Sequence, residues 1–372
     1  MAHVLEVTDL SVAFPNRDGG WRGSEVTVVD RVSLTIAPGE IVGLVGESGS
    51  GKSTTARGIL RLIPSSGHIV LHGVDISGMG DRQLRPHRRH AQMVFQDPYS
   101  SLDPAMTVAA LLAEAMHLDG VKRSRREARE RATELLEQVG LGAVHLDRYP
   151  AEFSGGQRQR VAIARALASR PSLIICDEAV SALDVSTQRQ IVRLLRRLRD
   201  ETGVAILFIA HDLAVVRQIA DRTIVMYCGQ LVEQGRSVEL FDQPAHPYTL
   251  ALLSAVPVPA PARQRGRHRL ILSGDAPNPA APPSGCRFHE RCPFVMDVCR
   301  TTEPVTTHTG DHSVRCHLHQ LDAPLPWTVV DTEIISEVAV SIEEEEQEDH
   351  DETADGIAVG IPNGEHGVTA SG

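Results

Sequence analysis

The sequence predicts an α/β fold built on a largely parallel sheet, and three observations support that class. Short apolar runs of strand length lie at 41–45, 173–176 and 204–209. Helix-favouring stretches alternate with them, at 52–62 after the first run and at 188–199 between the other two. Strand–helix–strand alternation is typical of parallel sheets covered by helices. A Gly/Ser loop joins the first of these strands to the first helix.

The remaining elements extend this core on both sides. Residues 4–14 alternate between apolar and polar positions, as half-buried strands do. Pro, Asn, Asp and three Gly at 15–25 predict a loop, and residues 26–36 again have strand character. Apolar positions at close to helical spacing predict a charged helix over 122–140.

Composition limits the classes of protein to which the chain can belong. Its 372 residues are enough for about two domains, and 42% apolar with 23% charged residues is ordinary for a globular protein. The longest clean apolar run, 204–210, is far shorter than the roughly 20 residues of a membrane-spanning helix. The start of the chain shows no signal-peptide pattern. We therefore expect a cytosolic chain that reaches a membrane only through a partner.

The net charge of −11 comes from one end of the chain. Residues 331–372 contain 13 acidic residues and neither Lys nor Arg, which leaves 37 basic and 35 acidic residues before them. That near-neutral body gives no general argument for a nucleic-acid partner. The acidic tail itself predicts a disordered, solvated segment.

The loop after the strand at 41–45 carries the clearest chemical signal. GESGSGKS at 46–53 fits G-x-x-x-x-G-K-[ST] and stands between a strand and a helix, the context that this motif requires. Its glycines let backbone N–H groups surround phosphate oxygens, and the helix N-terminus favours an anion. We expect Lys52 to reach the β- and γ-phosphates and Ser53 to ligate Mg²⁺. The flanking elements disfavour a plain Gly/Ser turn.

Two carboxylates follow the apolar strand at 173–176. Asp177 fits the acidic residue that holds Mg²⁺ directly or through water, and Glu178 is placed to polarise an attacking water. General-base assistance contributes typically about 10²–10⁴-fold to a rate. An isolated Asp-Glu pair is more often a solvated strand end, but the phosphate loop upstream favours the catalytic interpretation.

A further motif indicates a family. FSGGQRQR at 153–160 resembles the signature motif of ABC-type ATPases, and the other motifs follow in that family's order. Gln96 resembles the Q-loop glutamine, SALD at 181–184 the D-loop, and His211 the switch histidine. The resemblance covers roughly residues 4–320. It implies an ABC-type P-loop ATPase domain with a mixed or parallel sheet, an inserted helical subdomain and a small C-terminal module that contains Cys.

The resemblance also implies roles for single residues. Such ATPases work in head-to-tail pairs, in which the phosphate loop of one subunit and the signature loop of the other enclose ATP. Glu178, His211 and Lys52 are then catalytic, and Ser53, Gln96 and Asp177 form the Mg²⁺ site. The expected ATP-binding residues are Phe14, Gly46, Glu47, Ser48, Gly49, Ser50, Gly51, Lys52, Ser53, Thr54, Gln96, Asp177, Ser154, Gly155, Gly156 and Gln157.

Two positions need separate comment. The family expects an aromatic residue that stacks on adenine, for which Phe14 is the candidate, Trp21 a rival, and core packing of Phe14 the alternative. The residue after the Asp-Glu pair is usually Pro in this group and here is Ala179. That departure would loosen the following loop but leaves both carboxylates in place.

Three longer stretches narrow the subgroup. Residues 95–104, 180–186 and 239–257 look like those of oligopeptide/dipeptide importer ATPases, and the second is similar to the F-type member of their unlike pair. The resemblance implies an unlike ATPase subunit, two permease subunits and an extracytoplasmic peptide-binding protein. It places this chain peripherally at the cytoplasmic face of the cell membrane.

We expect four parts along the chain. Residues 1–255 form the ATPase domain, with its helical subdomain at about 97–170. A Pro-rich linker follows at 256–284, then a four-Cys module at 285–320 and the acidic tail at 321–372.

Four of the six cysteines predict a metal site. Cys176 and Cys228 fall in or near strands and are expected core residues, whereas the others are separated by 5, 6 and 16 intervening residues. Clustered thiols in a cytosolic chain more often bind metal than form disulfides. The resemblance favours a structural [4Fe–4S] cluster, with Zn²⁺ and metal-free thiols as alternatives. The expected ligands are Cys286, Cys292, Cys299 and Cys316, with His308, His312, His317 and His319 as substitutes or plain surface residues.

Other functions remain open at this point. An importer of the same architecture can carry nickel or another small solute. A soluble ABC-type protein acting on ribosomes or DNA is disfavoured, because the chain has one ATPase domain and no paired C-x₂-C module. The Cys module could also act as a metal sensor that controls the ATPase.

Overall fold

The computed structural model describes residues 3–15, 25–97, 101–255 and 281–321, together with the single positions 272, 274, 277, 278 and 325. Most of the expected linker, nearly all of the acidic tail, and Trp21 lie outside these residues.

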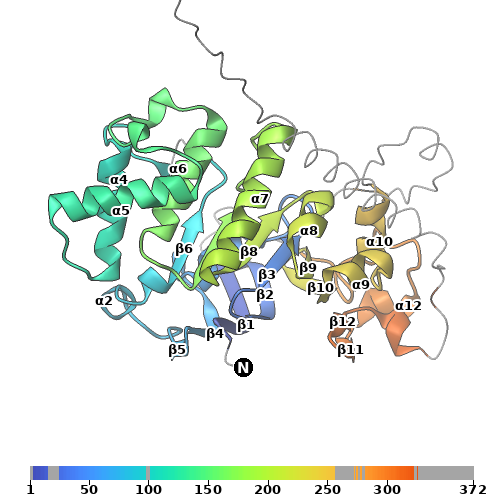
Figure 1. Ribbon diagram of the computed structural model, residues 1–372. Helices are drawn as coiled ribbons and strands as arrows, with labels where there is room; N and C mark the ends of the chain where they lie inside the picture. The colour runs from blue at the N-terminus through green and yellow to red at the C-terminus, as the bar shows by residue number, and fades with distance from the viewer. Residues whose placement is uncertain are drawn as a thin grey trace, which may run out of the picture.

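An eight-stranded mixed sheet forms the centre of the molecule (Figure 1). Five neighbouring strands run parallel, as the alternation of strands and helices predicts. The strands that follow β9 pair antiparallel, so the sheet is mixed. In sheet order the strands are β11 (Thr307–Thr309), β12 (His312–Val314), β10 (Gln230–Arg236), β9 (Arg222–Tyr227), β3 (Ile41–Val45), β8 (Ala205–Ala210), β7 (Leu173–Asp177) and β6 (Ala91–Val94).

A second, antiparallel sheet packs against the first. The predicted strands near the N-terminus are β1 and β2, which pair with each other, while β4 and β5 were not predicted. The order is β2 (Glu25–Ile36), β1 (Leu5–Pro15), β4 (Ser66–Leu71) and β5 (Val74–Asp75).

The central strands are buried on both sides, which explains their continuous apolar sequences. Ile41 and Val45 of β3 face a core shared with the helices, whereas Val42 and Leu44 face the core under the antiparallel sheet. Every residue of β3 is buried. The phosphate loop therefore starts from a strand that is held from both sides.

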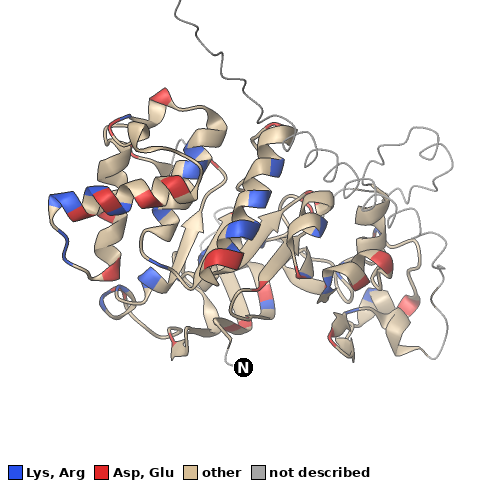
Figure 2. Ribbon diagram, in the orientation of Figure 1, with Lys and Arg blue, Asp and Glu red and all other residues tan. Residues whose placement is uncertain are grey.

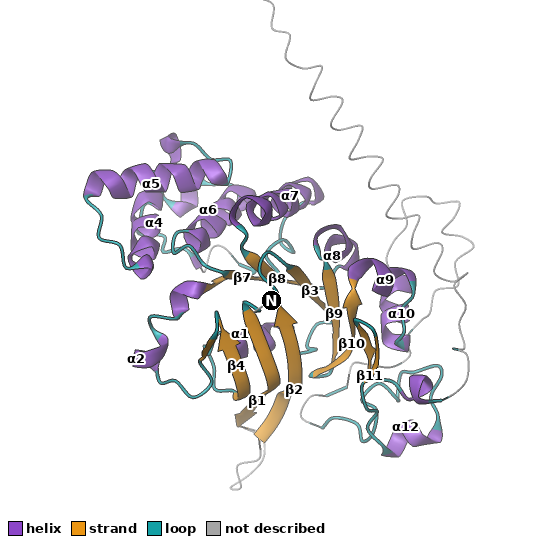
Figure 3. Ribbon diagram, turned by 60° about the horizontal axis from the view of Figure 1, so that its bottom comes forward, coloured by secondary structure: helices purple, strands orange, loops and turns teal. Residues whose placement is uncertain are grey.

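Helices cover the central sheet and form a separate group beside it. Figure 3 shows α4, α5 and α6 clustered at one end, which agrees with the expected helical subdomain. In Figure 2 both charge signs alternate along α5, as on a solvated helix face, whereas α7 carries Arg along its length and acidic residues only at its C-terminal end. The helices are α1 (Lys52–Ile59), α2 (Asp81–Leu84), α4 (Val108–Met116), α5 (Arg125–Gln138), α6 (Gly155–Leu167), α7 (Val185–Thr202), α8 (Leu213–Ile219), α9 (Ser237–Asp242), α10 (Pro247–Ser254) and α12 (Asp297–Thr301).

The C-terminal segment, predicted as a four-Cys module over 285–320, is joined to the central sheet. β12 pairs with β10, through Glu233 opposite Val314 and Gln234 opposite Ser313, and so joins the central sheet. In the part of the chain that the structure describes, no helix combines the length and the apolar character needed to cross a bilayer.

Candidate nucleotide site

The phosphate loop lies between β3 and α1, as its motif predicts. Gly46 has φ +154° and Gly51 has φ +105°, values that favour glycine. A Cβ at Gly46 would stand 2.1 Å from the carbonyl oxygen of Met226, and one at Gly51 would stand 3.0 Å from that of Val28. These glycines thus serve close backbone packing behind the loop, while Ser48 and Gly49 at its tip are exposed.

Lys52 is buried under this loop. Its Nζ donates to the carbonyl oxygens of Gly46 at 2.7 Å and Glu47 at 2.9 Å. Burial lowers the pKa of Lys52, and the nearby carboxylates of Glu178, Asp177 and Glu47 oppose that shift. Anionic phosphate in the loop would favour the charged ammonium in the same way.

Ser53 and Asp177 form one corner of the site. The Ser53 Oγ donates to Asp177 Oδ1 at 2.7 Å, which joins the start of α1 to the end of β7. Asp177 is 3% exposed, and this burial, reinforced by neighbouring Glu178, raises the pKa of its carboxyl. A hydroxyl and a carboxylate at this distance are oxygen donors of the kind that Mg²⁺ prefers, so the residues fit the expected ion. Thr54 follows in α1 and is half-buried.

Glu178 is held by three neighbouring segments. Its backbone has φ +48°, and its N–H donates to the carbonyl oxygen of Ile209 at 3.0 Å. The Gln96 amide donates to Glu178 Oε2 at 2.9 Å, and His211 Nδ1 lies 3.9 Å from the same oxygen. Ser181 Oγ donates to the Glu178 carbonyl oxygen at 2.9 Å. Residues far apart in sequence therefore meet at this one carboxylate.

The signature residues lie at the start of α6. The Ser154 hydroxyl accepts from the Gln157 N–H at 3.3 Å, and the Gln157 side chain accepts from the Ser154 N–H at 3.1 Å, which forms a capping box. A Cβ at Gly156 would stand only 2.4 Å from Thr187 of α7, whereas one at Gly155 would meet Leu183 at 3.6 Å. Ser154 is exposed. The segment thus presents its cap outward and packs its second glycine against the D-loop helix.

Phe14 lies in β1 opposite Val26 and is 39% exposed. Its side chain is therefore not a buried core residue, which was the alternative to an adenine contact. The rival, Trp21, lies outside the described residues.

The metal prediction for the four cysteines gains no support from the structure. Cys286 N donates to the Cys299 carbonyl oxygen at 2.8 Å, so these two segments do meet. Burial raises the pKa of both Cys292 and Cys316 to about 12, which favours protonated thiols. Among the residues that the structure describes, however, no three His, Cys, Asp or Glu side chains are grouped so that they could hold a metal ion. The structure therefore gives no support to Zn²⁺ or a cluster at these residues, although the four thiols lie near enough to one another to raise each other's pKa. Cys176 and Cys228 are buried, as expected.

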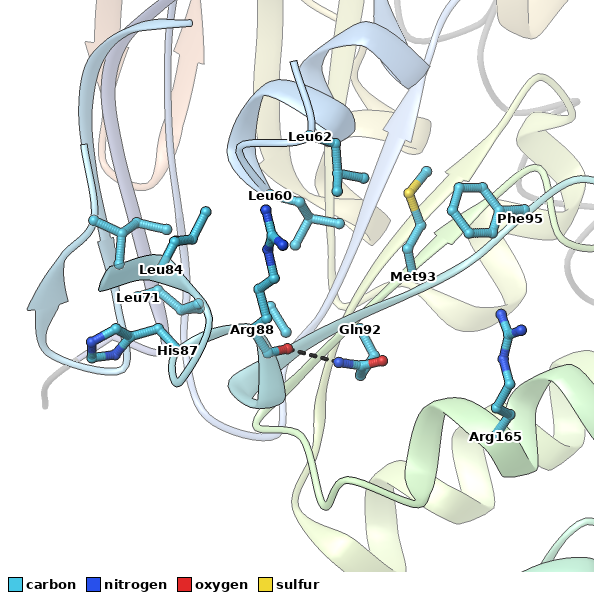
Figure 4. A pocket seen from close by; sticks show the side chains of 12 residues that line it. Leu60, Leu62, Leu71, Leu84, His87, Arg88, Gln92, Met93, Phe95 and Arg165 are labelled. Carbon is cyan, nitrogen blue, oxygen red and sulfur yellow. Dashed lines mark hydrogen bonds between the residues drawn. The ribbon is translucent and has the colours of Figure 1, made fainter. Parts of the chain in front are cut away.

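An apolar groove lies beside β6, and one residue of α6 contributes to its lining. Figure 4 shows Leu60, Leu84, Met93 and Phe95 around a cavity of about 220 Å³, with Arg165 reaching toward it from α6. Phe95 directly precedes Gln96, so the groove ends beside the amide that bonds Glu178. No sequence motif predicts this surface.

Sequence reasoning also missed the residues that hold the outer side of the phosphate loop. Arg291 forms an ion pair with Glu47, and the Tyr248 hydroxyl accepts from the Glu47 N–H at 2.8 Å. Tyr248 lies in the importer-like stretch 239–257 and Arg291 in the predicted Cys module, but neither resemblance assigns these residues a contact, and Arg291 is 244 positions from Glu47. No local sequence pattern predicts a contact between residues so far apart in the chain.

Comparison with known proteins gives two family matches. Residues 29–181 match the family model described as ABC transporter. Residues 232–299 match the model described as oligopeptide/dipeptide transporter, C-terminal region. The first match holds the phosphate loop and both carboxylates, and the second holds Arg291 and three of the four clustered cysteines.

Curated relatives match over most of the chain. It is 50% identical over 320 residues to the "probable peptide ABC transporter ATP-binding protein y4tS" of Sinorhizobium fredii, covering 85% of this chain and 90% of that protein. It is 48% identical over 318 residues to the oligopeptide transport ATP-binding protein OppF of Escherichia coli, covering 84% and 95%. Among solved structures, the dimeric ATP-binding cassette MJ0796 in a post-hydrolysis state with ADP and Pi matches with TM-score 0.57 and 30% identity, covering 63% of this chain and 98% of that one.

Proposed function

Because this chain belongs to the ATP-binding proteins of the oligopeptide/dipeptide ABC transporters, we propose a role for each part of its site in the hydrolysis of ATP. The chain binds ATP and energises an oligopeptide importer. The observation that carries the proposal is the convergence of Gln96, His211 and the Ser53–Asp177 pair around Glu178.

The proposed chemistry follows from these positions. The loop N–H groups and Lys52 bind the β- and γ-phosphates of the substrate. Ser53, Gln96 and Asp177 would hold Mg²⁺, which neutralises phosphate charge when bound. Glu178, 19% exposed and oriented by the Gln96 amide, accepts a proton from the attacking water. His211 orients the γ-phosphate or that water.

We propose that the signature segment completes a second subunit's site. Its cap is exposed, two glycines permit close approach of the backbone, and the N-terminus of α6 favours an anion. Ser154, Gly155, Gly156 and Gln157 would contact the γ-phosphate held by the partner's phosphate loop. The dimeric arrangement of the similar cassette supports pairing, and an unlike ATPase subunit is the proposed partner.

We further propose that a permease segment docks in the groove of Figure 4. Its apolar walls suit an apolar or amphipathic segment, and Phe95 connects them directly to Gln96. Two permease subunits and an extracytoplasmic peptide-binding protein complete the proposed transporter, which places this chain peripherally at the cytoplasmic face of the membrane. Adenine stacking on Phe14 belongs to the same proposal. A [4Fe–4S] cluster or Zn²⁺ rests on the resemblance alone, and the proposed function uses neither.

The test is Glu178→Gln, which keeps the shape of the side chain and removes its basicity. We expect ATP turnover to fall by about 10²–10⁴-fold, while ATP binding persists and ATP-bound dimers accumulate in size-exclusion chromatography. Glu201→Gln, the same change at an exposed position of α7, should leave turnover unchanged. Lys52→Ala should abolish nucleotide binding. Full turnover by Glu178→Gln would overturn the assignment of the base.

A further inference from the structure

The outer side of the phosphate loop is held by the C-terminal segment. Arg291 donates two hydrogen bonds to Glu47, from Nη1 to Oε2 at 2.7 Å and from Nη2 to Oε1 at 3.1 Å. The Arg291 side chain is only 10% exposed and that of Glu47 29%. A bidentate pair of this kind fixes orientation as well as position.

Every polar group of Glu47 described here is engaged. Its N–H donates to the Tyr248 hydroxyl at 2.8 Å, its carbonyl oxygen accepts from Lys52 Nζ at 2.9 Å, and its carboxylate binds Arg291. Glu47 therefore connects Lys52, which we expect to bind phosphate, with Tyr248 and Arg291.

Arg291 packs against a cluster of aromatic side chains. Its guanidinium lies 5.9 Å from the centre of the Tyr227 ring and donates to the Tyr227 hydroxyl at 3.4 Å. Burial raises the pKa of Tyr227 to about 12, so its phenol stays neutral. Phe288, which is fully buried, packs against the rings of Tyr227 and Tyr248 at 5.1 and 5.5 Å between centres.

A second anchor lies on the same segment. Arg287 donates to the carbonyl oxygen of Cys228 and to the carboxylate of Asp30, each at 2.5 Å. The stretch from Arg287 to Arg291 is therefore attached both to β2 and to the turn after β9. A segment attached at two places can hold the phosphate loop in one position, which a side chain free to move could not do.

We propose that Arg291 is a positioning residue for the nucleotide: through Glu47 it holds the phosphate loop in its binding conformation, so the C-terminal segment contributes to ATP affinity. The proposal rests on the nucleotide site proposed above. Small displacements of groups that position a substrate have large effects on its binding, because the loop must present several N–H groups to one phosphate chain.

The experiment measures the Kd of a fluorescent ATP analogue for the full chain. We expect Arg291→Ala to raise Kd by roughly tenfold, which corresponds to about 1.4 kcal/mol, with kcat at saturating ATP changed less than twofold. Arg291→Lys should restore part of the affinity, because an ammonium keeps the charge but not the bidentate geometry. Arg300→Ala removes an exposed Arg of the same segment and should not change Kd.

A double-mutant cycle with Glu47→Gln separates positioning from general damage. If the two residues act through each other, the double variant should bind ATP no more weakly than the weaker single variant. Additive losses, or an unchanged Kd in folded Arg291→Ala, would overturn the proposal. Should Arg291→Ala fail to fold by circular dichroism, Glu47→Gln decides, and unchanged affinity in that variant rejects the proposal. Failure of the wild-type chain to bind ATP would instead reject the proposed site.

Discussion

At the phosphate loop, polar side chains from α1, β7 and two loops lie within hydrogen-bond distance of one another. In the segment 286–316, four cysteines come from a similarly small region but are not grouped to hold a metal ion. Ser53 and Asp177 meet at 2.7 Å, and Gln96 and Glu178 at 2.9 Å. Between Cys286 and Cys299 the hydrogen bond that joins the two segments is made by backbone atoms.

The difference lies in what fixes each side chain. The nucleotide-site residues stand at the ends of parallel strands, whose carboxyl ends the sheet brings to one edge. The cysteines stand in turns and a five-residue helix, where the spacing along the chain does not by itself predict how their side chains are oriented. A cluster of reactive residue types therefore predicts a site reliably only where regular structure orients them.

The first and largest test enlarges one glycine on the nucleotide side. Gly156→Ala would press a methyl group against Thr187 at 2.4 Å, and the Thr187 hydroxyl is held by Asp184 at 2.7 Å. We expect a loss of about 1–3 kcal/mol in the free energy of unfolding, measured by urea denaturation. The signature loop should be displaced as well, which would lower turnover.

Two controls identify the cause of that loss. Gly155→Ala meets only Leu183 at an ordinary 3.6 Å, so its stability should be equal to the wild type or higher by up to about 1 kcal/mol. Thr187→Ser keeps the hydroxyl and removes the methyl group. Combined with Gly156→Ala, it should restore stability; if it does not, steric conflict is the wrong explanation.

The next test asks whether the cysteines are ligands. From their placement we expect neither iron nor zinc in stoichiometric amounts in anaerobically purified protein, and a loss of under about 1 kcal/mol for Cys292→Ser. Elemental analysis and an absorption spectrum measure the first, and denaturation measures the second. If the wild type contains iron and shows a broad absorption band near about 400 nm, and Cys292→Ser loses both, then the cysteines are metal ligands. The two regions would then not differ in forming a site.

The smallest effect concerns a titratable contact that holds the C-terminal segment to the sheet. His312 Nε2 lies 2.8 Å from an oxygen of Glu233, which is fully buried and also accepts from the N–H groups of Ala245 and His246. The hydrogen bond to Glu233 raises the pKa of His312 above its usual 6.5. The resulting stabilisation is complete below pH 6.5 and is lost as the pH rises through the folded-state pKa.

His312→Gln should therefore weaken the dependence of the free energy of unfolding on pH in this range. We expect the wild type to lose more stability than the variant when urea denaturation is repeated at increasing pH above 6.5. His246, whose pKa burial lowers to about 3, contributes equally to both profiles and so cancels from their difference. Parallel profiles for the two proteins would show that the contact carries no charge.

Much of the fold could be predicted from periodicity and turns. The strand at 41–45 agrees at both ends with β3, and the helix predicted over 122–140 is observed as α5, Arg125–Gln138. Short strands such as β5, with two residues, were missed because they have too few residues to show a period. The pairing of β12 with β10 joins distant segments and cannot be seen in a short stretch of sequence, whereas β9–β10 and β11–β12 are local hairpins that sequence reasoning missed.

The candidate site divides in the same way. Lys52, Asp177 and Glu178 were predicted because the motif couples residue type to a strand end. Their contacts with Gln96 and His211 were expected from the resemblance alone. Arg291 could not be predicted, since its partner Glu47 is fixed by the packing of the C-terminal segment and by no local spacing.

The pairing of β12 with β10 has a consequence for how the chain folds. The order of strands in the central sheet places the last described strands at one of its borders, beside a strand made more than 70 residues earlier in synthesis. Until residues 312–314 emerge from the ribosome, the free side of β10 offers unpaired N–H and C=O groups to any other extended chain. Shortened forms of the protein that end before β12 would expose this unpaired edge of β10 permanently. Their first defect would be self-association and not loss of catalysis.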